Sequence, residues 1–143
     1  MFDFDKHFLR LELPNSRLTQ LTLAPVVPDN DAFVATEITV RTVDKIEEVE
    51  NTDEIAVFKV QRIVDFSPAT LFRIEATFVY VLLYNPETYN DVDWKEVNLI
   101  QEIKEQSSKL LSPITARASL LVSKLTAATN LVPIITPPNF LAE

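Results

Sequence analysis

No glycine occurs among the 143 residues of this chain, and this absence constrains its architecture more than any other feature. Average usage of about 7% would supply roughly ten glycines. Three motifs depend on glycine: the GxGxxG dinucleotide turn, the Walker A loop and the GxSxG nucleophile elbow. All three are excluded, and with them the enzyme classes that are built on these motifs.

The chain also lacks the side chains that most often carry metal and nucleophilic chemistry. It has no cysteine, and its single histidine is His7. Disulfides, Cys-ligated zinc and thiol catalysis are therefore excluded, and a Ser-His-Asp triad is disfavoured. Glu87, Asp91 and Asp93 do not have the spacing of a calcium loop. We expect no metal site, no cofactor and no enzymatic activity.

The charge balance also restricts the partners. Lys and Arg number 13 against 21 Asp and Glu, which gives a net charge of −8 and a pI near 4.6. Such a chain is repelled by phosphate backbones and by anionic membranes, so we expect neither nucleic-acid binding nor membrane insertion. The acidic start is no signal peptide, and together with the absent cysteines it favours a soluble cytoplasmic protein.

The first 84 residues alternate apolar and polar side chains, as strands do. We expect antiparallel strands within 8–28, 32–50, 55–66 and 71–84, with one or two short strands in the first segment. Near its end the last segment is apolar on both faces. A strand of that kind is usually covered on both faces, and a second subunit could supply the second cover.

The periodicity then changes to that of helices. Asp93 and Glu96 form a capping-box pattern that predicts a helix opening at Trp94. Ser112-Pro113 predicts the start of an amphipathic helix that reaches about Thr129; alternatively, one helix runs from Ser107 with the proline in its first turns. The proline-rich tail, 130–143, should be extended.

These elements predict an α+β fold in a single domain, 1–143: a four-stranded antiparallel sheet (about 8–84) followed by two C-terminal helices (about 94–129) packed on one face.

The last third of the chain resembles the SecB family of protein-export chaperones. The clearest stretch runs from Leu110-Leu-Ser-Pro to Pro137-Pro-Asn-Phe140. The family's long helix has an early proline, an arginine one turn later and an apolar stripe, and a Pro-x-Asn-Phe segment follows it. The corresponding residues here are Pro113, Arg117, Leu121, Leu125 and 137–140. Phe72-Arg-Ile-Glu75 is similar to the start of the family's last strand, and the whole resemblance covers about residues 8–140.

This resemblance implies an ATP-independent holdase with apolar grooves between the sheet edge, the loop 85–93 and the helices. The groove residues that we expect are Tyr84, Tyr89, Trp94 and Phe140. A simpler interpretation assigns the aromatic stripe of residues 72–84 to the core and lets Trp94 staple its helix to the sheet.

The resemblance also implies two further surfaces. Glu75, Glu47 and Glu48 are candidates for a partner surface, although the acidic run 47–54 also suits a solvated hairpin tip. Arg73 replaces an apolar residue of the family at this surface, which argues against docking of the SecA motor.

Arg117, Leu121 and Leu125 are candidates for an oligomer interface in a homodimer or homotetramer. The alternative is that the same helical stripe packs on its own sheet.

Two functions follow from these expectations. The first is a chaperone that binds unfolded or unassembled polypeptides, for which export is one use and SecA one candidate partner that Arg73 argues against. The second is a SecB-fold interaction protein with one dedicated partner, such as the antitoxin of a toxin–antitoxin system, and no general holdase activity. The same fold can serve both functions.

Overall fold

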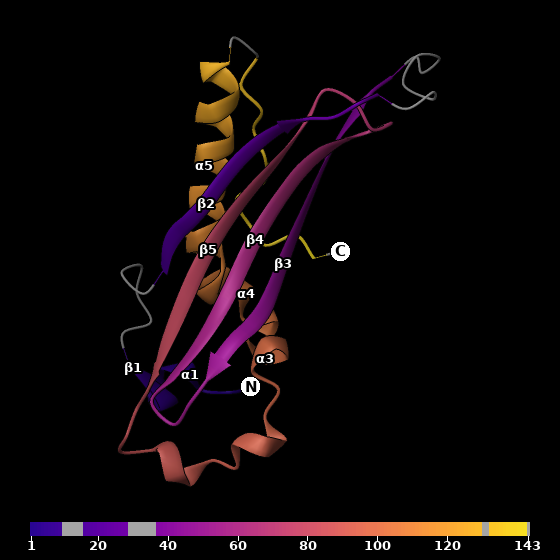
Figure 1. Ribbon diagram of the computed structural model, residues 1–143. Helices are drawn as coiled ribbons and strands as arrows, with labels where there is room; N and C mark the ends of the chain where they lie inside the picture. The colour runs from indigo at the N-terminus through magenta and orange to yellow at the C-terminus, as the bar shows by residue number, and fades with distance from the viewer. Residues whose placement is uncertain (10–15, 29–36, 130–131, 143) are drawn as a thin grey trace.

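The computed structural model describes residues 1–9, 16–28, 37–129 and 132–142. An antiparallel sheet forms one layer, and the C-terminal helices and the end of the chain lie against one of its faces (Figure 1). We call this the helix face, and the opposite one the outer face. The predicted α+β class is confirmed.

Three long strands form the body of the sheet as a meander. They are β3 (Thr39–Asn51), β4 (Ile55–Ser67) and β5 (Phe72–Tyr84), and β4 lies between the other two. Thr52 closes the β3–β4 hairpin, because its amide donates to Ile55 O over 2.8 Å and its Oγ1 accepts from the amides of Glu54 and Ile55.

The first predicted strand segment contributes two strands. The short β1 (Phe8–Leu9) pairs with the end of β5, and β2 (Ser16–Pro25) pairs with the rest of it. Both occupy the edge of β5 that β4 leaves free. The described part of the sheet therefore has five strands, and two of them lie in the first segment, where one or two short strands were predicted. The segments 10–15 and 29–36, which include part of the first predicted strand segment and the start of the second, lie outside the described residues.

The predicted helix opening at Trp94 is wrong. Residues Trp94–Glu96 make only a single 3-10 turn (η3), because Val97 returns to an extended conformation with φ −102° and ψ 122°. Helix α3 (Leu99–Glu105) begins after Asn98, whose side chain accepts from the Gln101 amide over 3.2 Å. The capping signal therefore lies five residues downstream of Asp93.

The second predicted helix is present. Helix α5 (Ser112–Ala128) carries its proline in the first turn and starts within one residue of the prediction. A separate turn, α4 (Ser107–Leu110), precedes it. Two short elements were not predicted: α1 (Phe4–His7), and the 3-10 turn η2 (Tyr89–Asp91) within the loop after β5. None of the described helices is both long and apolar enough to span a membrane.

The core lies between the sheet and the helices. Alternate residues of β4 and β5 point toward α3, α4 and α5 and are almost completely buried. The aromatic stripe Phe72, Phe78, Tyr80 and Tyr84 belongs to this core, with no member more than 8% exposed. The simpler interpretation of that stripe is therefore confirmed.

A buried ion pair in the same layer holds the end of the chain. Arg62 and Asp44 form a bidentate pair with both contacts at 2.7 Å, and their side chains are 1% and 0% exposed. The remaining donors of Arg62 reach the C-terminal segment at Thr136 Oγ1 (3.1 Å), the Pro137 carbonyl and the Asn139 carbonyl (2.9 Å). A charge buried in this way is tolerable only when its donors are satisfied.

Candidate functional site

A hollow of about 360 Å³ lies where the hairpin end of β3 meets the segment that precedes α3. We call it the edge groove. Its lining mixes apolar and charged side chains, and consists of Glu48, Lys95, Glu96, Val97, Asn98, Leu99 and Ile100. Neither the loop 85–93 nor any of the four expected groove residues contributes to this lining, so the groove that the resemblance implies stays a prediction.

An aromatic cluster holds the loop that leads into this groove. The Trp94 ring stacks on Tyr89 at 5.7 Å and meets Tyr84 edge-on at 4.8 Å. The indole Nε1 donates to the Tyr89 carbonyl over 2.9 Å. The Phe8 ring lies against the rings of Tyr84 and Trp94. Such contacts orient the loop, because aromatic pairs prefer defined stacked or edge-on geometries.

Tyr84 anchors the cluster to the sheet. Its hydroxyl donates to Asn51 Oδ1 over 2.6 Å, and this hydrogen bond links the end of β5 to the end of β3. Burial raises the pKa of Tyr84 to about 12. The phenol therefore stays protonated, and remains a hydrogen-bond donor, at physiological pH.

The backbone of β3 offers an unpaired edge beside the groove. The Asp44 amide points away from β4, since it donates to Leu141 O over 2.7 Å. Alternation along an antiparallel strand places the amide and carbonyl of Ile46 on the same edge. Within the described part of the chain no backbone group bonds to them there. Leu141 of the C-terminal segment thus meets β3 two residues before Ile46.

This arrangement is suited to binding an extended chain. A strand edge supplies main-chain hydrogen bonds that do not depend on sequence, and neighbouring pockets hold alternate side chains. Val97 and Ile100 are only partly buried and add apolar contact, while Lys95 and Glu96 bring charges of both signs to the rim.

The structure brings three of the four predicted groove residues together. Tyr84, Tyr89 and Trp94 form one cluster, in which Tyr84 is 5% exposed and the other two are half-buried. Phe140 is half-buried in the C-terminal segment, next to the Leu141 that meets β3. Contact of these residues with a polypeptide stays a prediction.

The three glutamates of the predicted partner surface do not share one face. Glu47 and Glu75 lie on the outer face, and each is paired with a base, Lys59 at 2.7 Å and Arg73 at 2.9 Å respectively. Glu48 lies on the other side of β3, where it lines the edge groove. Glu47 and Glu48 are adjacent in a strand, and successive side chains of a strand point to opposite faces.

The residues of the predicted oligomer interface make contacts within the chain. Arg117 lies over the Phe78 ring at 5.2 Å, and its Nη1 donates to Ser16 O and Oγ. Leu121 and Leu125 are half-buried against the core. Among the large apolar residues of α5, Leu120 is exposed, at 55%. The role of Arg117, Leu121 and Leu125 in an interface between subunits remains a prediction.

The Arg62–Asp44 pair and the open edge at Ile46 were not identified from sequence. One signal was available, because Asp44 falls on the same alternation as Thr42 and Ile46 and therefore on the core side of β3. A lone acid in such a position requires a buried partner, but the sequence alone does not say which of the basic residues supplies it.

Comparison with known proteins gives a match in structure only. No protein-family model and no curated protein sequence matches the chain. Among solved structures, the chain is similar to the SecB-like chaperone Rv1957 of Mycobacterium tuberculosis, solved with a ChAD peptide from the antitoxin HigA1. The identity is 13% over 85% of each chain, with a TM-score of 0.51. The chain therefore has a SecB-like fold.

Proposed function

We propose that the chain is a SecB-fold chaperone that binds extended segments of non-native polypeptides in the edge groove. The observation that carries this proposal is the unpaired backbone of β3 at Ile46, beside a hollow lined by Val97, Leu99 and Ile100. Apolar burial contributes about 25 cal/mol per Å², so several short contacts can hold a chain without ATP or catalytic residues. Such an activity suits a cytoplasmic homodimer or homotetramer.

The C-terminal segment would limit what the groove accepts. Leu141 occupies the β3 edge at Asp44, so a bound strand would pair from Ile46 toward the hairpin. Ser119 and Thr115 hold the carbonyls of Thr136 and Pro138, which fixes the segment along α5. A client would therefore contribute a short stretch of strand, in keeping with binding that tolerates many sequences.

The test is light scattering of a denatured model protein diluted into buffer with and without the chain, in the absence of ATP. The wild type should suppress aggregation at a near-stoichiometric ratio. Val97→Glu, which places a charge in the groove, should lose most of this effect. Val81→Glu is the matched control, because Val81 is a half-buried valine on the outer face. The proposal would be refuted if both variants lost the suppression of aggregation to the same extent, or if the wild type did not suppress aggregation.

A dedicated partner is the second candidate, and it is favoured by the antitoxin peptide in the complex of the structural neighbour. Trp94 is the only tryptophan and immediately precedes Lys95 of the groove lining, so its fluorescence can report binding. Titration with an antitoxin-derived peptide and with unrelated denatured proteins separates the two functions. A general holdase responds to the whole panel, whereas a dedicated chaperone responds to one peptide and leaves aggregation unchanged.

A further inference from the structure

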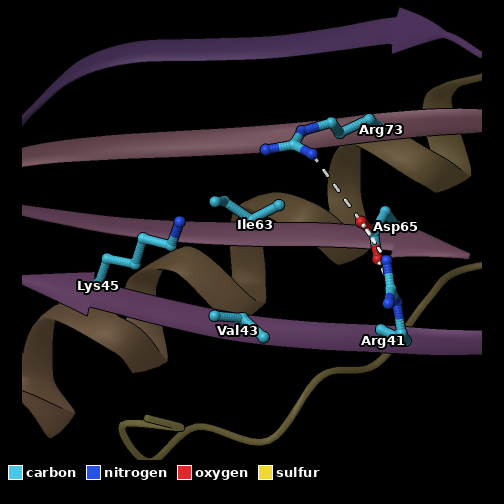
Figure 2. Close-up of a pocket in the computed structure, with 6 residues that line it drawn as sticks. All are labelled: Arg41, Val43, Lys45, Ile63, Asp65 and Arg73. Carbon is cyan, nitrogen blue, oxygen red and sulfur yellow. Dashed lines mark hydrogen bonds and ion pairs between the residues drawn. The ribbon is translucent and has the colours of Figure 1, made fainter. Parts of the chain in front are cut away.

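A second hollow lies on the outer face of the sheet, where none of the described helices packs (Figure 1). Its volume is about 220 Å³. Figure 2 shows the side chains that line it, which come from β3, β4 and β5: Arg41, Val43, Lys45, Ile63, Asp65 and Arg73. We call it the cationic hollow. It is separate from the edge groove, which opens on the other side of β3.

Two carboxylates hold the arginines of the hollow in place. Arg41 donates from Nε and Nη2 to the two oxygens of Asp65 at 2.9 and 3.0 Å. Arg73 donates to Glu75 Oε1 at 2.9–3.0 Å, and its Nη1 lies 3.9 Å from Asp65. Each guanidinium therefore keeps an Nη1 group with no hydrogen bond to the described residues. Donors that are already oriented lose less entropy when a ligand binds.

Lys45 supplies the remaining positive charge. Its side chain is exposed and makes no hydrogen bond or ion pair with any described residue. Figure 2 shows its amino group and the Arg73 guanidinium on either side of Ile63, each coming from a strand that flanks β4. Ile63 is 7% exposed although it faces outward, so the hollow has an apolar floor and cationic walls.

The whole outer face differs in charge from the rest of the chain. Its described basic residues are Arg17, Arg41, Lys45, Lys59 and Arg73, and its acidic residues are Glu47, Glu50, Asp65 and Glu75. The face is thus close to neutral, with an excess of positive charge at the hollow, on a chain whose net charge is −8. The net charge of the molecule opposes the approach of a negative partner, and the excess of positive charge at the hollow attracts it locally.

We propose that the cationic hollow is a docking site for an acidic side chain carried by an extended segment of a partner protein. The volume suits one glutamate or aspartate. Half-buried aliphatic residues continue along the same face at Val57, Val79 and Val81, so the matching segment carries an acid followed by apolar residues. Nucleic acid does not fit this description, because a polyanion would also meet the acidic remainder of the chain.

The test uses a fluorescein-labelled ten-residue peptide that carries one glutamate followed by alternating valine and serine, with versions in which glutamine or lysine replaces the glutamate. Anisotropy with the full chain gives affinities, and amide chemical shifts locate the site. We expect binding of the glutamate peptide alone, with shifts at residues 43–45, 63–65 and 73–75. The affinity should fall several-fold as salt rises from 50 to 200 mM, because the contact is exposed and screened.

Two charge reversals complete the test. Lys45→Glu should weaken binding about tenfold, because it replaces an attraction by a repulsion. Lys124→Glu makes the same change at an exposed position of α5 and should alter the affinity less than twofold. Equal effects of the two variants, equal binding of the glutamine peptide, or shifts confined to the edge groove would overturn the proposal. None of these results depends on chaperone activity, so this proposal and the function proposed above can fail separately.

Discussion

The substitution Asp44→Asn should destabilise the chain far more than its small change in size suggests. It removes the counter-charge of Arg62 while the guanidinium stays buried, with 1% of its side chain exposed. Removing one partner of a buried ion pair costs about 3–5 kcal/mol. A domain of this size is stable by about 5–15 kcal/mol, so the variant loses a large share of its stability.

The assay is urea unfolding followed by circular dichroism. The free energy of unfolding falls by about 2 kcal/mol per M of urea for a domain of this kind. A loss of about 4 kcal/mol in that free energy therefore lowers the urea concentration at the unfolding midpoint by about 2 M. Asp65→Asn is the matched control, because Asp65 also forms a bidentate pair with an arginine, Arg41, whose side chain is 59% exposed. That exposed pair should contribute less than about 1 kcal/mol.

A second measurement identifies the cause. The Asp44 side chain also accepts the Leu141 amide over 2.8 Å, and Arg62 holds the carbonyls of Pro137 and Asn139. Amide exchange in the C-terminal segment should therefore accelerate in the variant before the sheet is affected. A loss below about 1.5 kcal/mol, or similar losses for Asp44→Asn and Asp65→Asn, would refute the role assigned to the buried pair.

Two further predictions concern single residues. Burial raises the pKa of Tyr80 to about 12 against an ordinary value of 10. The unfolded chain therefore loses this proton first, and stability falls by about 2–3 kcal/mol as the pH rises from 10 to 12. Its hydroxyl has no hydrogen-bond partner among the described residues, so Tyr80→Phe should preserve or raise stability at pH 7 and weaken the alkaline decline, measured by urea unfolding across this range. Leu71 adopts φ +60°, a conformation that costs a residue with a side chain about 1–2 kcal/mol. Leu71→Gly should therefore gain about 0.5–1 kcal/mol in the same assay, whereas Leu71→Ala, which keeps the strain, should not; a loss on Leu71→Gly would contradict this explanation.

The strands were predictable because their signal is local. The alternation in β4 and β5 reflects one covered face, and every member of the predicted stripe at 72, 78, 80 and 84 is buried. The start of α5 was predictable for a similar reason, since Pro113 suits the first turn of a helix and disrupts later turns.

The start of α3 was not predictable from its capping signals. Asp93 and Asn98 both have cap side chains, and each accepts an amide in the structure. The choice between them depends on packing, because Leu99 and Ile103 are buried in the core when the helix starts at Leu99. Local propensity ranks such alternatives weakly, and tertiary contacts decide between them.

The candidate site likewise has some features that the sequence predicts and others that depend on tertiary contacts. By itself the sequence determined that the chain carries no glycine-dependent, thiol or histidine-cluster chemistry, since those functions need residue types that are absent or single. It also determined the strand and helix periods, which depend on neighbouring residues. Only the tertiary structure decided that Arg62 pairs with Asp44 and that Leu141 meets the free edge of β3 at Asp44. These contacts join residues far apart in the chain, and the free energy that selects them comes from burial and charge pairing in the folded state.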